Sequence, residues 1–254
     1  MKVVILAGGY GTRLSEYTET IPKPMVEVGG LPIIHHIMNR YAAFGFNDFV
    51  LALGYKADVL KDYFRSIPDL SEDDKDIHGS NDTLLVGKEA IDWRVRLADT
   101  GEGTFTGGRV GRLAQYLKDE TFMLTYGDGL CDIPLDKLLE FHRSHGKLAT
   151  ISAVRPVARF GELKLHGEQV VSFQEKPQVT SSWINGGFFI CEPKVIDLIQ
   201  DDLTVWEKEP LETLSHENEL MAFKHEGFWQ CMDTKRDRDF LEELWVTGTP
   251  PWVA

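Results

Sequence analysis

The chain has 254 residues, and its 27 Lys and Arg against 40 Asp and Glu give a formal net charge of −13 at pH 7. With 43% hydrophobic and 26% charged residues, the composition is typical of a soluble globular protein, and the length suffices for one large domain, residues 1–254. The acidic balance argues against nucleic acid or an anionic membrane as a partner, so a polyanionic ligand must meet a locally basic pocket.

The first apolar run, residues 3–7, predicts a buried parallel strand because it is continuous, rich in β-branched residues and ends at glycines. It is too short for a membrane helix and no small-residue cleavage site follows, so we expect neither an anchor nor a signal peptide. The three cysteines, Cys131, Cys191 and Cys231, form no CxxC pair, which favours a reducing compartment and a packing role. We therefore expect a cytoplasmic protein.

Strand-like and helix-like segments alternate through the rest of the first half. Further strands are predicted at 49–53, 93–98 and 122–126, and helices at 33–44, 57–64 and 107–117. This alternation predicts an α/β fold in which a parallel sheet carries helices on both faces. Ligands on such sheets bind beyond the carboxyl ends of the strands, which is where the glycine-containing segments 8–13 and 127–129 stand.

The second half has the pattern of antiparallel strands joined by short turns. Strands are predicted at 149–154, 162–165, 170–173, 186–191, 220–225 and 229–232, and a closing helix at 236–245. Earlier in the chain, residues 66–82 are acidic and rich in turn formers, which predicts a surface insertion or lid. We expect the aromatic residues near the end of the chain in the core or at a subunit interface: Phe223, Phe228, Trp229, Trp245 and Trp252.

Three glycines, Gly8, Gly9 and Gly11, follow the first strand and would let backbone N–H groups approach an anion. A dinucleotide fingerprint that begins at Gly9 needs glycine at position 14, where Leu14 stands, and a Walker A loop needs a Gly-Lys-Ser/Thr run that is absent. Neither common nucleotide loop explains the segment, and a bare glycine turn remains an alternative.

Lys23 stands between Pro22 and Pro24, which restrict the backbone and mount one positive charge rigidly; a surface turn with a solvated lysine is the alternative. The run LAGGYGTRL…PKPMVEVGG resembles the amino-terminal signature of the sugar-1-phosphate nucleotidylyltransferases. SEYTETIPKPM, DTGEGTFTGGR, LTYGDGLCD, FQEKP, INGGFF and GFWQCMDT extend the resemblance, in order, across essentially the whole chain. Ser15 and Glu16, where most UTP and dTTP enzymes have proline, agree with the cytidylyl branch.

The resemblance implies a Rossmann-like, GT-A-like fold: a mixed, mostly parallel sheet flanked by helices, with a small antiparallel sugar-binding portion. It implies a nucleotide-binding part at about 1–130 and a sugar-binding and C-terminal part at about 131–254. The implied reaction is Mg²⁺-dependent transfer of a cytidylyl group from CTP to α-D-glucose 1-phosphate, giving CDP-glucose and pyrophosphate. The implied setting is a homo-oligomer that feeds surface-polysaccharide synthesis, including O-antigen, without nucleic-acid or membrane partners.

The resemblance also assigns roles to particular residues. Arg13 would hold the departing phosphates and Lys23 the charge at the α-phosphoryl group, so these two and Asp128 are the expected catalytic residues. Arg109 would read the cytosine edge, unless it is a solvated arginine. The residues expected to bind nucleotide are Leu6, Ala7, Gly8, Gly9, Gly11, Thr12, Arg13, Lys23, Thr104, Gly108, Arg109 and Asp128.

The residues expected to bind the sugar phosphate are Gly161, Glu175, Lys176, Asn185 and Gly186. Asp128 and Asp233 are the expected Mg²⁺ ligands, since Mg²⁺ prefers carboxylate oxygens. Asp128 is otherwise part of a glycine turn, and Asp233 is otherwise the N-cap of the last helix.

Two other functions remain open on the sequence. A uridylyl- or thymidylyltransferase would share the chemistry and differ at the base-reading segment 104–109. A non-catalytic nucleotide-sugar sensor would share the fold and bind without releasing pyrophosphate.

Overall fold

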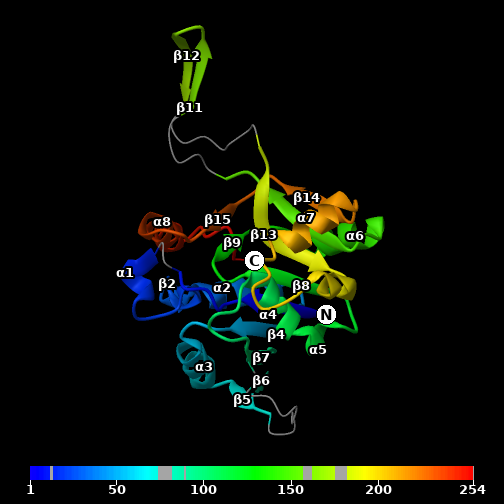
Figure 1. The fold of residues 1–254 in the computed structure, drawn as a ribbon. Coiled ribbons are helices and arrows are strands. Elements are labelled where there is room, and N and C mark those ends of the chain that lie inside the picture. Colours follow the sequence, from blue (N-terminus) through cyan, green and yellow to red (C-terminus); the bar gives the residue numbers. More distant parts are fainter. Residues whose placement is uncertain (12–13, 74–81, 89, 157–161, 175–181, 254) are drawn as a thin grey trace.

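A mixed sheet of nine strands runs through the structure, in the order β14-β10-β13-β8-β1-β4-β7-β6-β5. The computed structural model describes residues 1–11, 14–73, 82–88, 90–156, 162–174 and 182–253 (Figure 1). Four central strands run parallel: β1 (Lys2–Leu6), β4 (Asp48–Leu53), β7 (Arg94–Asp99) and β8 (Phe122–Tyr126). The sequence predicted each of them within a residue or two.

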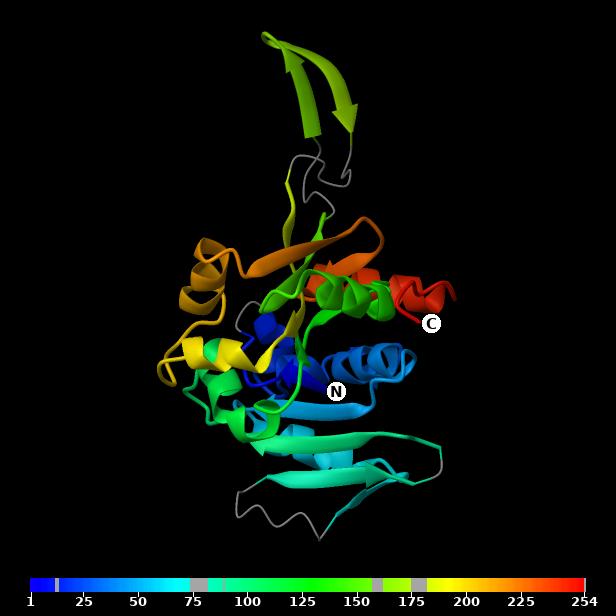
Figure 2. The same ribbon diagram turned by 90° about the vertical axis from the view of Figure 1, so that its right-hand side faces the viewer.

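Both faces of this sheet are buried, which explains the continuous apolar strands. In β1, Val3 and Ile5 belong to one hydrophobic cluster, whereas Val4 and Leu6 belong to the other. Burying such side chains contributes roughly 1.5–3 kcal/mol each. The first cluster includes residues of four helices: α2 (Ile33–Ala42), α3 (Ala57–Ser66), α6 (Leu135–His145) and α8 (Lys235–Val246). The second includes residues of three: α4 (Thr106–Arg112), α5 (Ala114–Leu117) and α7 (Glu209–His216). The layers on the two sides are visible in Figure 2.

The second half of the chain extends the same sheet. The strand β13 (Ile184–Cys191) pairs antiparallel with β8, and β10 (Ala149–Val154) and β14 (Leu220–His225) follow it outward. The hairpin of β11 (Glu162–His166) and β12 (Gln169–Gln174) projects from the rest of the fold in Figures 1 and 2. The mixed α/β fold predicted from the sequence is therefore confirmed.

Shorter elements complete the fold. They are α1 (Ser15–Thr18), the 3-10 helices η2 (Lys23–Met25) and η3 (Pro193–Leu198), the pair β2 (Glu27–Val28) and β3 (Leu31–Pro32), and the pair β9 (Gly129–Cys131) and β15 (Trp229–Cys231). Among the described residues, no helix is both long and apolar enough to cross a membrane.

The acidic segment 66–82 differs from the prediction where the structure describes it. Residues 70–72 form β5 (Leu70–Glu72), which pairs antiparallel with β6 (Thr83–Gly87) at the edge of the sheet. None of the described residues of this segment lines the main cleft. Residues 70–72 therefore extend the sheet, whereas residues 74–81 lie outside the described residues, and a role of the segment as a lid stays a prediction.

The helix predicted at 107–117 is divided at Leu113, whose backbone angles, φ −90° and ψ 2°, interrupt it. Its glycines serve close packing: a Cβ on Gly108 would lie 2.4 Å from the Asp202 carbonyl oxygen. The C-terminal aromatic residues, expected in the core or at a subunit interface, lie in the core or pack against it. Trp252 is 1% exposed, and the other four pack against the first cluster.

A pH effect on stability follows from His35 on α2. Its Nδ1 lies 2.6 Å from the Tyr63 hydroxyl, and its ring packs against Trp93. Burial, with a smaller effect of His36, lowers the pKa of His35 from 6.5 to about 4. Between pH 6.5 and pH 4 the unfolded chain therefore takes up this proton more readily than the folded chain. The contribution of neutral His35 to the free energy of unfolding is fully present above pH 6.5 and declines as the pH falls toward 4.

We expect the free energy of unfolding, measured by urea titration, to fall between pH 7 and pH 4, and to fall less in His35→Leu. The exposed His216→Gln is the control. An identical pH dependence in His35→Leu and the parent protein would contradict the prediction.

Candidate functional site

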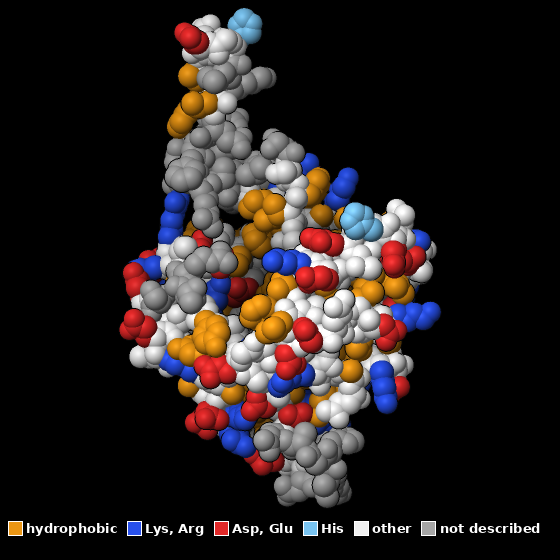
Figure 3. All heavy atoms as spheres, viewed as in Figure 1, with side chains coloured by type: hydrophobic (Ala, Val, Ile, Leu, Met, Phe, Trp, Pro, Cys, Tyr) orange, Lys and Arg blue, Asp and Glu red, His pale blue; other side chains and the backbone are white. Residues whose placement is uncertain are grey.

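A cleft of about 1470 Å³ opens beyond the carboxyl ends of β1 and β8, as the α/β topology predicted. Its walls come from both halves of the chain: the glycine loop, the 102–106 loop, the end of β8, the start of β13 and the segment 229–237. On the face shown in Figure 3, Lys and Arg are interspersed with Asp and Glu. The described lining of the cleft likewise holds both signs of charge, with Lys23, Arg109 and Arg236 beside several carboxylates.

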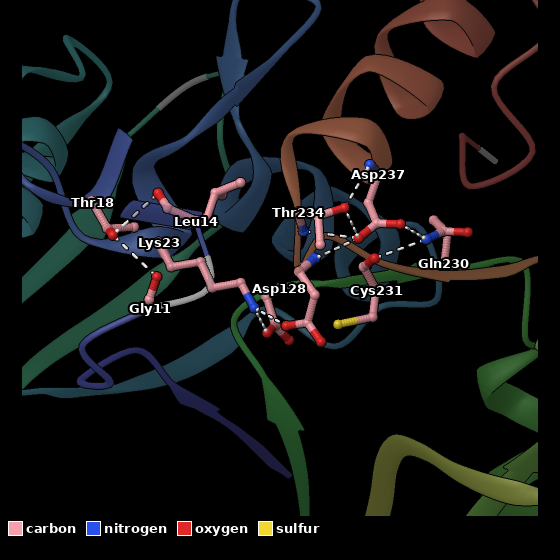
Figure 4. Close-up of polar contacts among 10 residues, drawn as sticks. Gly11, Leu14, Thr18, Lys23, Asp128, Gln230, Cys231, Thr234 and Asp237 are labelled. Atoms are coloured by element: carbon pink, nitrogen blue, oxygen red, sulfur yellow. Dashed lines mark hydrogen bonds and ion pairs between the residues drawn. The ribbon is translucent and has the colours of Figure 1, made fainter. Parts of the chain in front are cut away.

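A compact charged group lies in this cleft (Figure 4). The Lys23 ammonium is 2.6 Å from Asp128 Oδ2 and 2.5 Å from Asp233 Oδ1. Lys23 is carried by η2, Asp128 follows β8, and Asp233 follows β15. Three residues separated by up to 210 positions in the sequence are thus brought together, and the alternative of a solvated lysine on a surface turn is wrong.

The charges in this group stabilise one another. Burial alone would lower the pKa of Lys23, but the attraction of Asp128 and the hydrogen bonds to both carboxylates raise that pKa above its ordinary value. Burial and the charge of Asp128 also raise the pKa of the Cys231 thiol. At neutral pH, Lys23 therefore keeps its charge and Cys231 keeps its proton.

The two aspartates and Cys231 form the one cluster of metal-ligating groups among the described residues, with ligand atoms within 4.8 Å of one another. Cys231 was not expected at the site, because its sequence pattern predicted a packing residue like Cys131 and Cys191. Both of those are buried in the core, whereas Cys231 lines the cleft. The carboxylate oxygens of Asp128 and Asp233 fit a hard divalent ion, whereas the Cys231 sulfur is a soft donor.

Asp233 is held from the helix that follows it. Thr234, not Asp233, is the N-cap of α8, and it forms a capping box with Asp237. The Asp237 carboxylate also accepts a hydrogen bond of 3.1 Å from the backbone N–H of Asp233, and its other oxygen accepts one from Gln230. The side chain of Asp233 is thereby left for Lys23, and the N-cap alternative is wrong.

The glycine loop approaches the cleft as predicted, with Leu6, Ala7, Gly8, Gly9 and Gly11 in its wall. Gly11 has a φ of +61°, a value that favours glycine, and its carbonyl accepts a hydrogen bond from Thr18 Oγ1 (Figure 4). Thr12 and Arg13, expected to bind phosphate, lie outside the described residues.

Arg109 is 4% exposed and holds the backbone that surrounds the glycine loop. Its terminal nitrogens donate to the carbonyl oxygens of Gly8 at 2.9 Å, Leu53 at 2.9 Å and Gly101 at 2.8 Å, and to Thr100 Oγ1 at 2.7 Å. The solvated-arginine alternative is wrong, because the guanidinium is surrounded by backbone. Direct contact with a base stays a prediction.

The other predicted residues are distributed unevenly. Thr104, Asn185 and Gly186 line the cleft, whereas Gly108 packs against Asp202 behind it. The remaining sugar-phosphate residues lie outside the described ranges: Gly161, Glu175 and Lys176.

Two further cleft residues, Tyr126 and Glu207, had not been predicted. Glu207 Oε1 accepts a hydrogen bond of 2.5 Å from the Tyr126 hydroxyl. Tyr126 stands directly before Gly127 and Asp128, so its position was a usable signal, whereas nothing in the sequence around Glu207 indicates a site.

Comparison with known proteins agrees with this geometry. Residues 2–237 match the nucleotidyl transferase family. The chain is 51% identical over 254 residues to glucose-1-phosphate cytidylyltransferase of Salmonella typhimurium, covering 99% of this chain and 98% of the relative. It is 39% identical over 253 residues to a probable glucose-1-phosphate cytidylyltransferase of Bacillus subtilis, covering 99% of each. The crystal structure of HddC from Yersinia pseudotuberculosis superposes with a TM-score of 0.69 at 26% identity, covering 96% of this chain and 99% of that one. The resemblance drawn from the sequence motifs is thereby confirmed.

Proposed function

This chain belongs to the nucleotidyl transferase family, and on that premise we propose that it transfers a cytidylyl group from CTP to α-D-glucose 1-phosphate. The products are CDP-glucose and pyrophosphate. The observation that carries the proposal is the Lys23–Asp128–Asp233 group, which lies in a cleft whose walls include the glycine loop and Asn185. The 51% identity over nearly the whole chain supports the choice of CTP and glucose 1-phosphate.

Lys23 supplies the positive charge that two anionic reactants need in order to meet. A unit-charge contact at 4 Å is worth roughly 4 kcal/mol at an effective dielectric constant of 20. Because two carboxylates accompany Lys23, several cations must act together to offset the repulsion between the reactants. The flanking prolines and two carboxylates hold Lys23 in place, so little reorganisation is needed when charge develops. Arg13 and Lys176 are the further cations that the motifs imply.

The remaining cleft residues position the two substrates. Gly8, Gly9, Gly11, Asn185 and Gly186 all line the cleft. In this proposal the backbone of the three glycines would meet the nucleotide phosphates, and Asn185 and Gly186 would meet the sugar. A division into a nucleotide part at about 1–130 and a sugar part at about 131–254 is part of the proposal; β8 and β13, which pair antiparallel, would then stand on either side of it. In-line attack on the α-phosphorus requires close approach of the two reactants.

We place a Mg²⁺ ion on Asp128 and Asp233, whose carboxylates already share one cation in the structure. When bound, Mg²⁺ would neutralise charge on the phosphate oxygens. The Cys231 thiol is a soft ligand, which Mg²⁺ does not use, so the two carboxylates carry the selectivity. The expectations of a cytoplasmic homo-oligomer and of a role in surface-polysaccharide synthesis also stay proposals.

The test is pyrophosphate release with glucose 1-phosphate, Mg²⁺ and each of CTP, UTP, dTTP, ATP and GTP in turn. We expect release with CTP to exceed the others clearly. Release with UTP or dTTP instead would keep the chemistry and overturn the cytidylyl assignment. Binding of CTP without release under any condition would favour the sensor.

A second prediction concerns the cation that the two aspartates share. Lys23→Met removes the ammonium, so the carboxylates are left to attract a free ion. We expect Mn²⁺, measured by electron paramagnetic resonance without nucleotide, to bind this variant about tenfold more tightly or better. Lys137→Met, at an exposed lysine paired with Glu140, is the control. Equal or weaker Mn²⁺ binding in Lys23→Met would mean that Lys23 does not compete for the site.

A further inference from the structure

A carboxylate that phosphate chemistry does not require lies in the cleft. Glu207 precedes α7, is partly buried, and lines the cleft with Thr106 and Tyr126. Its Oε1 accepts a hydrogen bond from the Tyr126 hydroxyl at 2.5 Å, and its Oε2 accepts one from Thr106 Oγ1 at 2.7 Å. Among the described residues, the hydrogen bonds of this carboxylate come from hydroxyl groups, whereas Asp128 and Asp233 are paired with a cation.

The two hydroxyl groups fix the orientation of Glu207. Tyr126 is held edge-on against Phe189, with ring centroids 5.9 Å apart, and Thr106 Oγ1 also accepts a hydrogen bond from the backbone N–H of Trp206. The carboxylate is therefore tied to the end of β8 and the start of α4. Each of its oxygens accepts one hydrogen bond and keeps capacity for another, so it is an acceptor prepared for a ligand.

The charge of Glu207 selects the kind of group that it can meet. An acidic side chain repels phosphate, and the two hydrogen bonds that fix Glu207 come from Tyr126 and Thr106, not from Lys23. Sugar hydroxyls are neutral donors, and hydrogen bonds to a charged acceptor are strong. Burial, followed by the charge of Glu207, raises the pKa of Tyr126, which keeps that phenol a donor.

Both substrates carry hydroxyl groups, on the glucosyl ring and on the ribose. The Tyr126 hydroxyl that binds Glu207 also accepts a hydrogen bond of 3.3 Å from Asn185 Nδ2, and Asn185 is one of the residues proposed to bind the sugar phosphate. We propose that Glu207, oriented by Tyr126 and Thr106, accepts a hydrogen bond from one hydroxyl of the glucosyl ring and so selects the sugar 1-phosphate. The assignment rests on the proposed function and adds to it a residue that determines sugar specificity.

The experiment pairs Glu207→Gln with deoxy substrates. Steady-state kcat/KM is measured for glucose 1-phosphate and its 2-, 3-, 4- and 6-deoxy analogues with CTP, and for CTP against 2′-deoxy- and 3′-deoxy-CTP. In the parent enzyme, the analogue that lacks the bound hydroxyl is expected to lose roughly 10- to 100-fold in kcat/KM. We call this loss in kcat/KM, relative to the full substrate, the penalty of the analogue. In Glu207→Gln that one penalty shrinks to a few-fold, while the other analogues and both deoxy-CTPs keep their penalties.

Two further variants serve as a control and as a second test of the assignment. Glu209→Gln, at an exposed glutamate two residues along the chain, should leave every penalty unchanged. Tyr126→Phe keeps the ring but removes the hydroxyl, and it should reduce the same single penalty by a smaller factor; it also decides the matter if Glu207→Gln does not fold.

The outcomes are distinguishable. Unchanged penalties in Glu207→Gln and Tyr126→Phe, with an active parent enzyme, would overturn the assignment alone. A penalty that shrinks for a deoxy-CTP instead would place the ribose at Glu207 and overturn the glucosyl assignment. A parent enzyme that does not turn over glucose 1-phosphate would overturn the proposed function, and the role of Glu207 with it.

Discussion

Asp128→Asn is expected to lower turnover by about a thousandfold while the fold stays intact. The carboxylate of Asp128 is one of two that share the Lys23 ammonium, at 2.6 Å, and one of two proposed Mg²⁺ ligands. A neutral amide is a poor ligand for a hard cation and no longer orients the ammonium by charge. A loss of roughly 4 kcal/mol of transition-state stabilisation corresponds to that factor.

The measurement is kcat for pyrophosphate release, with near-ultraviolet circular dichroism to establish the fold. Asp132→Asn is the matched control, because Asp132 is four positions away, pairs with His225 and does not line the cleft. We expect near-parent turnover in the control. Near-parent turnover of Asp128→Asn in excess Mg²⁺ would remove Asp128 from the mechanism.

Arg109→Met is expected to destabilise the protein by roughly 3 kcal/mol and to weaken CTP binding together with stability. The guanidinium is 4% exposed and donates to the carbonyl oxygens of Gly8, Leu53 and Gly101. Methionine removes these hydrogen bonds, while the carbonyls of Gly8 and Leu53 keep donors from Tyr55 and Thr100. Gly8 belongs to the glycine loop, and Gly101 lies beside the 102–106 loop. The variant therefore loses the side chain that hydrogen-bonds to both of these cleft walls.

Arg112→Met, on the same helix, is the control. Arg112 is exposed and pairs with Asp202 at the surface, an interaction worth about 0–1 kcal/mol. Urea unfolding and equilibrium CTP binding are measured for both variants. Parent-like stability with lost CTP binding in Arg109→Met would show that Arg109 contacts the base itself instead of holding the loops.

Much of the fold could be predicted because its signals are local. The continuous apolar strands at residues 3–7 and 122–126, and the glycines after them, predicted a sheet with both faces buried and a ligand site at the carboxyl ends. The short strands β9 and β15 were harder: only β15 was expected, because β9 follows Asp128 immediately and has no alternation of its own. The β5–β6 extension was missed because acidic turn-forming residues hide a three-residue strand.

The candidate site was predictable to a smaller degree. Two residues of the site stand in motifs that indicate a role. Lys23 lies between two prolines, and Asp128 follows the end of an apolar strand. Asp233 was ambiguous in sequence, since an aspartate before a helix suits an N-cap as well as a metal ligand. Thr234 takes the cap, which settles that ambiguity and leaves Asp233 for Lys23.

By itself the sequence determined the class of fold, the family and the position of the glycine loop, because these depend on residues adjacent in the chain or on ordered motifs. The tertiary structure alone decided which groups meet: Lys23 with Asp233, Arg109 with Gly8, and Tyr126 with Glu207. Each of these pairs joins segments at least 81 residues apart. Contacts of that kind arise from the packing of the sheet and its connecting loops, and no local pattern of residues encodes them.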